Sequence, residues 1–129
     1  MIKFARLFFL AALLAPANTA LAQTDNLINI SLTNYAFTPN AITLKAGTTY
    51  HLHFINNGSK DHNFSAPQFF AASQIAPEDQ AKVKKGLVEL ESGQSVDVAV
   101  TPGQAGTFAV ECKHFMHEMM GMHGSITVE

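Results

Sequence analysis

The chain has 129 residues, of which 47% are hydrophobic and 14% are charged, and its formal net charge at pH 7 is −2. This length suits one globular domain with its own hydrophobic core and leaves too little chain for two. The mildly acidic charge, without a basic cluster, excludes nucleic acid as an expected partner. The single cysteine, Cys112, excludes an internal disulfide.

Residues 1–22 have the pattern of a secretory signal peptide. Two basic residues start the segment, an apolar run follows at 7–15, and Ala20-Leu21-Ala22 offers small residues for cleavage. The apolar run is too short to span the ~30 Å hydrocarbon core of a bilayer, and no later segment is long enough. We therefore expect an exported, periplasmic protein with one domain at 23–129 and no membrane span after cleavage.

Short segments of alternating hydrophobicity predict β-strands. Alternate side chains of a strand share one face, so Ile28, Ile30 and Leu32 are expected to face a core. Turn residues such as those at 56–59 and 102–106 separate the segments. The expected strands are 27–33, 41–45, 49–56, 94–101, 107–112 and 125–128. Several strands of this kind indicate a sandwich or a barrel.

One region departs from the strand pattern. Residues 77–86 begin with Pro77, carry two acidic residues in the first turn and three lysines towards the end, and finish at Gly86. This distribution predicts a short helix. A further turn is expected within 69–74. The region 69–86 is therefore predicted to be a short helical insertion between strands, with its lysines in solvent.

Two other features are given structural interpretations. His51 and His53 share the face of a predicted strand opposite Leu52 and Phe54, so we expect them to be exposed rather than to bind a metal as a pair. The aromatic pair Phe69-Phe70 is expected to belong to the core.

Residues that could bind a metal are concentrated in the segment 111–124. It holds the one cysteine, three of the six histidines and four of the five methionines. An exported protein must protect a single thiol by burial or by a metal. Gly121 and Gly124 disfavour a core helix here, and sulfur beside imidazole suits copper better than hard cations. The potential ligands are Cys112, His114, Met116, His117, Met119, Met120, Met122 and His123.

A type 1 copper site uses two imidazoles and one thiolate in a plane, with a weak axial thioether. One short loop does not easily supply four ligands from four directions, so we expect one of them from elsewhere in the chain. His62 is the candidate, because it follows the predicted strand 49–56 and its turn, near one end of the sandwich.

The motifs His62-Asn63-Phe64 and Cys112-x4-His117-x4-Met122, the second followed by a glycine and a last strand, resemble the two ligand motifs of the cupredoxin family. The resemblance to these plastocyanin- and azurin-like proteins covers about 27–129. It implies an all-β, Greek-key β-sandwich of the cupredoxin type, with copper as the cofactor.

Position by position, the resemblance implies that His62, Cys112 and His117 are the trigonal ligands and Met122 the axial one. It also implies that Asn63 holds the ligand loop through backbone hydrogen bonds, a role worth about 10–100-fold in metal affinity.

The loop departs from the family pattern and leaves alternatives open. Many cupredoxins place a proline between Cys and His, whereas this loop has none, and His114 competes with His117 as a ligand. Met119 and Met120 compete with Met122, and the shorter His-to-Met spacings of the family favour Met120. We favour Met122 because its position just before the last strand is the one that the family pattern requires.

Two functions fit these residues. The first is one-electron transfer to a redox partner by a monomeric carrier that is not an enzyme, since the sequence shows no acid–base pair or activated nucleophile. The second is copper handling, in which the surplus loop ligands bind copper from a donor or pass it to an acceptor. Thioethers hold Cu(I) and imidazoles hold Cu(II). Electron transfer is favoured because the family resemblance covers the whole domain, while the surplus ligands occupy one loop.

Overall fold

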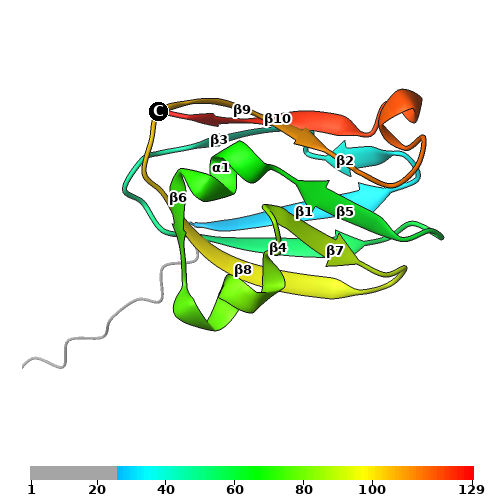
Figure 1. Cartoon of the computed structure of the whole chain (residues 1–129), viewed down its shortest axis with the longest axis horizontal. Coiled ribbons are helices and arrows are strands. Elements are labelled where there is room, and N and C mark those ends of the chain that lie inside the picture. The colour runs from blue at the N-terminus through cyan, green and yellow to red at the C-terminus, as the bar shows by residue number, and fades with distance from the viewer. Residues whose placement is uncertain (1–25) are drawn as a thin grey trace, which may run out of the picture.

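Ten β-strands form about half of residues 26–129, the part of the chain that this computed structural model describes (Figure 1). The strands are β1 (Leu27–Thr33), β2 (Ala36–Thr38), β3 (Ala41–Leu44), β4 (Tyr50–Asn56), β5 (His62–Ser65), β6 (Ser73–Ile75), β7 (Leu87–Leu90), β8 (Ser95–Pro102), β9 (Gly106–Glu111) and β10 (His123–Val128). One sheet has the order β2-β1-β4-β8-β6 and the other the order β3-β10-β9-β5-β7. The two sheets face each other, so the prediction of an all-β sandwich is confirmed.

The predicted signal peptide at 1–22 lies outside the described residues. Within residues 26–129, no helix combines the length and the apolar character needed to cross a membrane.

The strands with clear alternation were predictable from the sequence. Each of the six predicted strands is present, with ends that differ from the prediction by at most two residues. The strands that were not predicted, β2, β5, β6 and β7, have only three or four residues. Every residue of β5 is buried, so this strand has no polar face and shows no alternation.

The helical insertion predicted for 69–86 is present but is more divided than expected. It comprises α1 (Pro67–Ala71), β6 and a 3-10 helix, η1 (Pro77–Lys82). The helix predicted for 77–86 is too long, because the chain is extended at Val83, with φ −111° and ψ 102°. Lys84 then forms an isolated β-bridge with Leu87 in place of a further helical turn.

One buried carboxylate ties the insertion to the sandwich. Asp79 of η1 accepts hydrogen bonds from Lys82 Nζ at 2.6 Å and from the backbone N–H of Ala99 in β8 at 2.8 Å. These bonds lower the pKa of Asp79 below its ordinary value, with the Lys82 contact as the largest cause. The three lysines of the region are exposed, as predicted.

The structure also shows how far the aromatic pair and the two strand histidines are buried. Phe69 and Phe70 are buried, as predicted. His51 is exposed, whereas His53 is only half-exposed because its Nδ1 contacts Asp97 Oδ1 at 2.6 Å. Neither histidine belongs to a group of potential metal ligands within the described residues.

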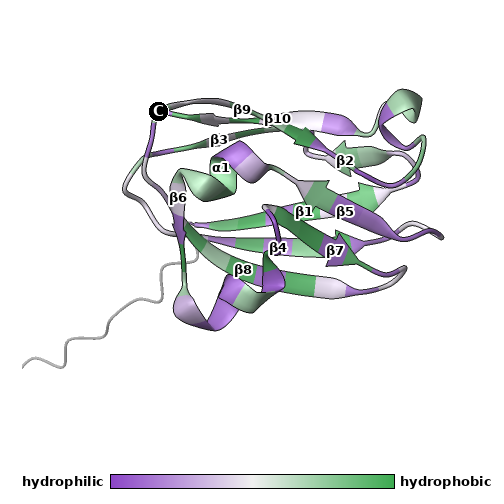
Figure 2. Ribbon diagram, in the orientation of Figure 1, coloured by the Kyte–Doolittle hydropathy of each residue, from purple (hydrophilic) through white to green (hydrophobic). Residues whose placement is uncertain are grey.

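Aromatic rings join the two sheets in the core. Hydrophobic residues occur in strands of both sheets, where the ribbon in Figure 2 is green. The ring of Phe64 in β5 lies 4.9 Å from that of Phe54 in β4 of the opposite sheet and 5.5 Å from that of Phe37 in β2, centroid to centroid. His62 lies two residues before Phe64 and therefore shares its inward face. Packing of Phe64 thus also fixes the direction of the His62 side chain.

Candidate metal centre

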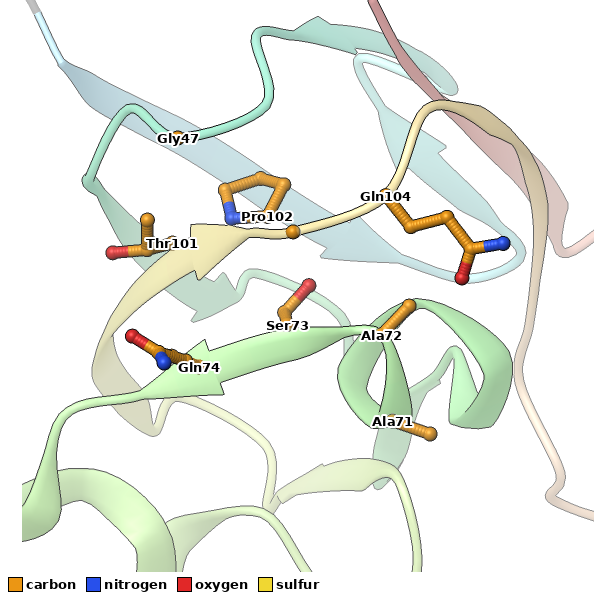
Figure 3. A pocket seen from close by; sticks show the side chains of 9 residues that line it. Gly47, Ala71, Ala72, Ser73, Gln74, Thr101, Pro102 and Gln104 are labelled. Atoms are coloured by element: carbon orange, nitrogen blue, oxygen red, sulfur yellow. The ribbon is translucent and has the colours of Figure 1, made fainter.

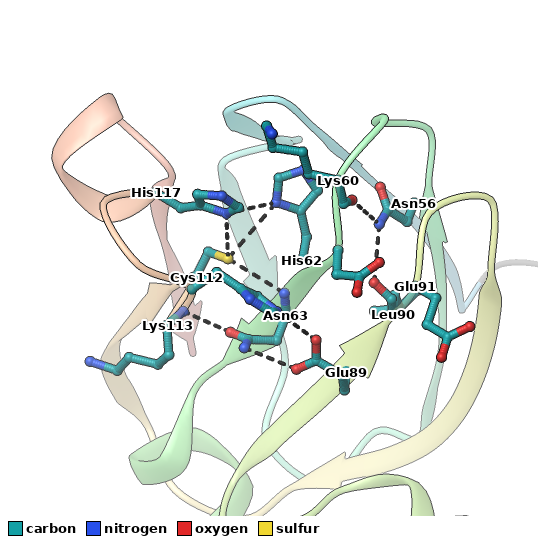
Figure 4. Close-up of polar contacts among 12 residues, drawn as sticks. Asn56, Lys60, His62, Asn63, Glu89, Leu90, Glu91, Cys112, Lys113 and His117 are labelled. Atoms are coloured by element: carbon teal, nitrogen blue, oxygen red, sulfur yellow. Dashed lines mark hydrogen bonds and ion pairs between the residues drawn. The ribbon is translucent and has the colours of Figure 1, made fainter.

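Three potential metal ligands meet at one end of the sandwich (Figure 4). His62 begins β5, Cys112 directly follows β9, and His117 lies in the loop before β10. Their ligand atoms all lie within 4.8 Å of one another. The two Nδ1 atoms are 3.1 Å apart, and Cys112 Sγ lies 3.4 Å from His117 Nδ1 and 3.9 Å from His62 Nδ1. All three side chains are buried.

Backbone hydrogen bonds close the loop between β9 and β10 onto itself. The N–H of Cys112 donates to Met122 O at 3.2 Å, and the N–H of Met122 donates to His117 O at 3.1 Å. The Met122 backbone therefore contacts both loop residues of the ligand group, and its side chain is fully buried. The loop is held at its two ends and at its middle.

The residues of the loop that compete as metal ligands differ in burial and in their contacts. Met122 is 0% exposed, whereas Met119 is 83% and Met120 is 55% exposed. Among these three methionines, only Met122 lies in the protein interior with the other candidates. His114 does not belong to the ligand group, because its Nε2 contacts Glu89 Oε1 at 2.5 Å.

Asn63 connects the two segments that supply the ligands. Its backbone N–H donates to Cys112 Sγ at 3.4 Å, and its side-chain Oδ1 accepts from the N–H of Lys113 at 2.8 Å. Its Nδ2 donates to Glu89 Oε2 at 3.0 Å. The same carboxylate contacts His114, so Asn63 and Glu89 together hold the start of the loop against β5 and β7.

Sequence reasoning missed three residues near the ligand group: two that contact its imidazoles, and Glu89, which contacts Asn63 and His114. Asn34 Oδ1 accepts a hydrogen bond of 2.7 Å from His62 Nε2, which leaves His62 Nδ1 without a proton and directed at the ligand group. The ring of Tyr35 lies 4.8 Å from that of His117. Glu89 is the third. All three come from distant segments, and no motif spacing connects them with Cys112.

A glycine beside His62 is required by close contacts. A Cβ atom at Gly58 would lie 2.4 Å from Asn34 Oδ1 and 2.9 Å from His62 Nε2. A side chain here would displace the hydrogen bond that orients His62.

Burial sets the protonation of the ligand group. It lowers the pKa of His62, with the neighbouring His117 as the second cause, and it lowers the pKa of His117. Burial raises the pKa of the Cys112 thiol. At neutral pH both imidazoles are therefore neutral and the thiol keeps its proton until a metal displaces it. Two neutral imidazoles, one thiol and a buried thioether side chain nearby form a donor set that fits copper.

These shifts predict how the stability of the metal-free protein depends on pH. Below about pH 6.5, the ordinary imidazole pKa, the unfolded chain gains protons that buried His62 and His117 resist. The free energy of unfolding should therefore fall as the pH is lowered from about 7 to about 5. Above the ordinary thiol value of 9.0, unfolded Cys112 loses a proton that the folded protein retains, so stability should fall again.

Urea unfolding of the metal-free protein across this range checks the prediction. The range stays above the pKa of Asp79, which lies below its ordinary 3.8. A free energy of unfolding that rises between about pH 7 and pH 5 would contradict the assignment of neutral, buried imidazoles.

A shallow hollow lies at the other end of the sandwich and has no chemistry of this kind (Figure 3). Its volume is about 540 Å³, and it lies between the end of α1, β6 and the turn after β8. Small and uncharged residues, such as Ala72, Ser73 and Thr101, line it. No titratable side chain is among these lining residues.

Solved structures share this fold at low sequence identity. An auracyanin from Roseiflexus castenholzii is 21% identical, with 81% of this chain and 98% of that chain covered and a TM-score of 0.60. Auracyanin A, a "blue" copper protein from Chloroflexus aurantiacus, is 20% identical over 80% and 98% of the two chains, with a TM-score of 0.57. A multicopper oxidase from Campylobacter jejuni is 13% identical over 88% of this chain and 32% of that chain, with a TM-score of 0.59.

Similarity at such low identity shows the fold alone, so family membership rests on a comparison of the sequence itself. No similar sequence was found among curated proteins. The family model described as a cupredoxin-like domain matches residues 4–128. This match covers nearly the whole sequence and includes both segments that supply the buried ligand group. The chain therefore belongs to the cupredoxin-like family.

Proposed function

We propose that this chain is an exported copper protein that carries single electrons between redox partners. The observation that supports this most directly is the group of three buried ligand atoms within 4.8 Å. His62, Cys112 and His117 would hold the metal, and Met122 would add a thioether donor. Bound copper supplies one-electron chemistry because it alternates between Cu(II) and Cu(I).

The protein's own residues favour fast electron transfer by restricting movement of the ligands. His62 is fixed by the Asn34 bond, and Cys112 by the N–H of Asn63. Burial of all three ligands excludes water and limits rearrangement when the charge changes. The N–H bond to Cys112 Sγ also withdraws charge from a thiolate and so favours the reduced state of the site.

We propose a carrier rather than an enzyme. Similarity to a "blue" copper protein over 98% of its length supports this, whereas the chain matches only about a third of the multicopper oxidase. Within residues 26–129, the one group of three or more potential His, Cys, Asp or Glu ligands is the buried set His62, Cys112 and His117. The signal-like sequence at 1–22 supports a periplasmic location. We propose a monomer that docks transiently with its redox partners.

Two histidine variants test the ligand assignment. We expect His117→Ala to remove or strongly change the visible absorption of the copper-loaded protein, because it deletes one buried ligand. His114→Ala is the matched control in the same loop and should keep the band, since His114 contacts Glu89 instead. Absorption spectra during addition of Cu(II) distinguish them. A band lost in the His114 variant and kept in the His117 variant would reverse the assignment.

The hydrogen bonds of the Asn63 side chain predict effects on copper affinity and on stability. Asn63→Ala removes the acceptor of the Lys113 N–H and the donor to Glu89. We expect copper affinity to fall about 10–100-fold and the free energy of unfolding to fall by about 1–3 kcal/mol, because a partly buried N–H loses its partner.

Copper competition titrations and urea unfolding measure these two effects. Asn57→Ala is the control, since Asn57 is exposed and, among residues 26–129, its side chain bonds only to Ser31 Oγ, at 2.8 Å. Equal copper affinities of the two variants would show that the Asn63 contacts do not support the site.

Copper handling is a second candidate function, favoured by one specific observation. Met116, Met119 and Met120 are exposed on the loop that carries His117. Sulfur side chains in solvent are available to an incoming or departing copper ion, which a pure electron carrier does not require.

A further inference from the structure

Exposed apolar side chains concentrate on one turn of the ligand loop. Within residues 26–129, four of the five exposed large hydrophobic residues lie at positions 115–120. Three of these four are methionines, Met116, Met119 and Met120, with exposed fractions of 48%, 83% and 55%. Methionine is an adaptable core residue, so three together in solvent require a reason other than packing.

The backbone holds the three methionines on a single turn. The N–H of Met120 donates to Met116 O at 3.2 Å and to His117 O at 3.2 Å, and Met119 and Met120 belong to the 3-10 helix η2 (Glu118–Met120). Gly121, with φ +95°, ends the turn. The bond from Met120 N–H to Met116 O closes the turn, so Met116, Met119 and Met120 lie within one turn of backbone.

The turn also contains an unfavourable backbone conformation. Met116 has φ 64°, in the left-handed region that residues with a side chain rarely adopt. Such conformations are unfavourable and occur preferentially at functional positions. The conformation begins the turn that brings the three methionines together.

We propose that Met116, Met119 and Met120 form a second metal site, specific for Cu(I), on the surface beside the buried ligand group. Thioethers are neutral, soft donors that favour Cu(I) over Zn²⁺ or hard cations. Each methionine side chain has three rotatable bonds, and all three side chains are exposed, so rotation of the side chains would bring the sulfur atoms to one ion. The site shares no ligand with the buried group and does not depend on electron transfer at Cys112.

Stoichiometry of Cu(I) binding tests the site. The protein, kept reduced and free of oxygen, is titrated with Cu(I) in competition with a chromophoric Cu(I) chelator. We expect two equivalents for the natural sequence and one for the variant with Met116→Leu, Met119→Leu and Met120→Leu, which keeps the apolar bulk. Phe115→Leu is the matched control, because Phe115 is exposed on the same loop but has no sulfur, and it should retain two.

Cys112→Ser separates this proposal from the proposed function. In this variant the buried site is impaired, and the surface site should still bind one equivalent of Cu(I). NMR of methionine labelled with ¹³C at the methyl group should then show shifts of Met116, Met119 and Met120 in Cys112→Ser. The absence of any Cu(I)-dependent shift of these three methyl groups would overturn the proposal, as would an unchanged stoichiometry in the triple-leucine variant. Neither result depends on whether Cys112 binds Cu(II).

Discussion

Replacing Cys112 with serine is expected to abolish the intense visible absorption that Cu(II) gives with the natural protein. Such a band requires charge transfer from a thiolate to the metal, and a serine hydroxyl does not ionise to replace it at neutral pH. The thiol is buried, and its sulfur lies 3.4 Å from His117 Nδ1 and 3.9 Å from His62 Nδ1, so all three atoms can bind one metal ion. Loss of affinity should exceed the about 10–100-fold expected when a residue that only contacts a ligand is changed.

Absorption spectra during Cu(II) addition and a competition titration measure this effect. The substitution changes one atom, and urea unfolding of the two metal-free proteins checks that the fold is retained. The natural protein should saturate its band at one copper. A band of undiminished intensity in folded Cys112→Ser would show that the buried thiol is not a copper ligand.

Truncation of Phe64 is expected to have the largest effect on stability. Phe64 is 1% exposed, and its ring packs against Phe37, Phe54 and Phe70 at centroid distances of 5.5, 4.9 and 6.5 Å. Phe64→Ala leaves a cavity between the sheets and should lower the free energy of unfolding by about 3–5 kcal/mol. This is a large part of the about 5–15 kcal/mol that stabilises a typical domain.

Urea unfolding of the metal-free protein measures the loss. Phe115→Ala is the control, since Phe115 is 88% exposed and should change stability by no more than about 0.5 kcal/mol. Comparable losses in the two variants would contradict the packing described for Phe64. The Phe64 variant should also bind copper more weakly, because Phe64 lies two residues after His62 and holds β5 against the opposite sheet.

The sequence predicted the strands whose two faces differ and missed those whose faces do not. In β1, buried Ile30 and Leu32 alternate with more exposed residues, and the predicted bounds match the observed ones. In β5 all four residues are buried, so periodicity carries no information there. The predicted helix at 77–86 was wrong in length because its composition suited a helix beyond Lys82, whereas Lys84 pairs with Leu87.

The same contrast applies to the candidate site. His62, Cys112 and His117 were proposed as ligands from their motifs, and the structure brings their ligand atoms together. Met122 was favoured over Met120 from its position before the last strand, and its burial supports that choice without testing it. Asn34 and Glu89 could not be predicted, because their contacts depend on the pairing of segments far apart in the sequence.

A redox titration of the protein loaded with one equivalent of copper, followed at its visible band, tests the central claim most directly. The account predicts that the band disappears and returns along a single one-electron curve, identical in the two directions, and that copper remains bound throughout. Release of copper on reduction, or a band that does not return on reoxidation, would contradict electron transfer at the site of His62, Cys112 and His117.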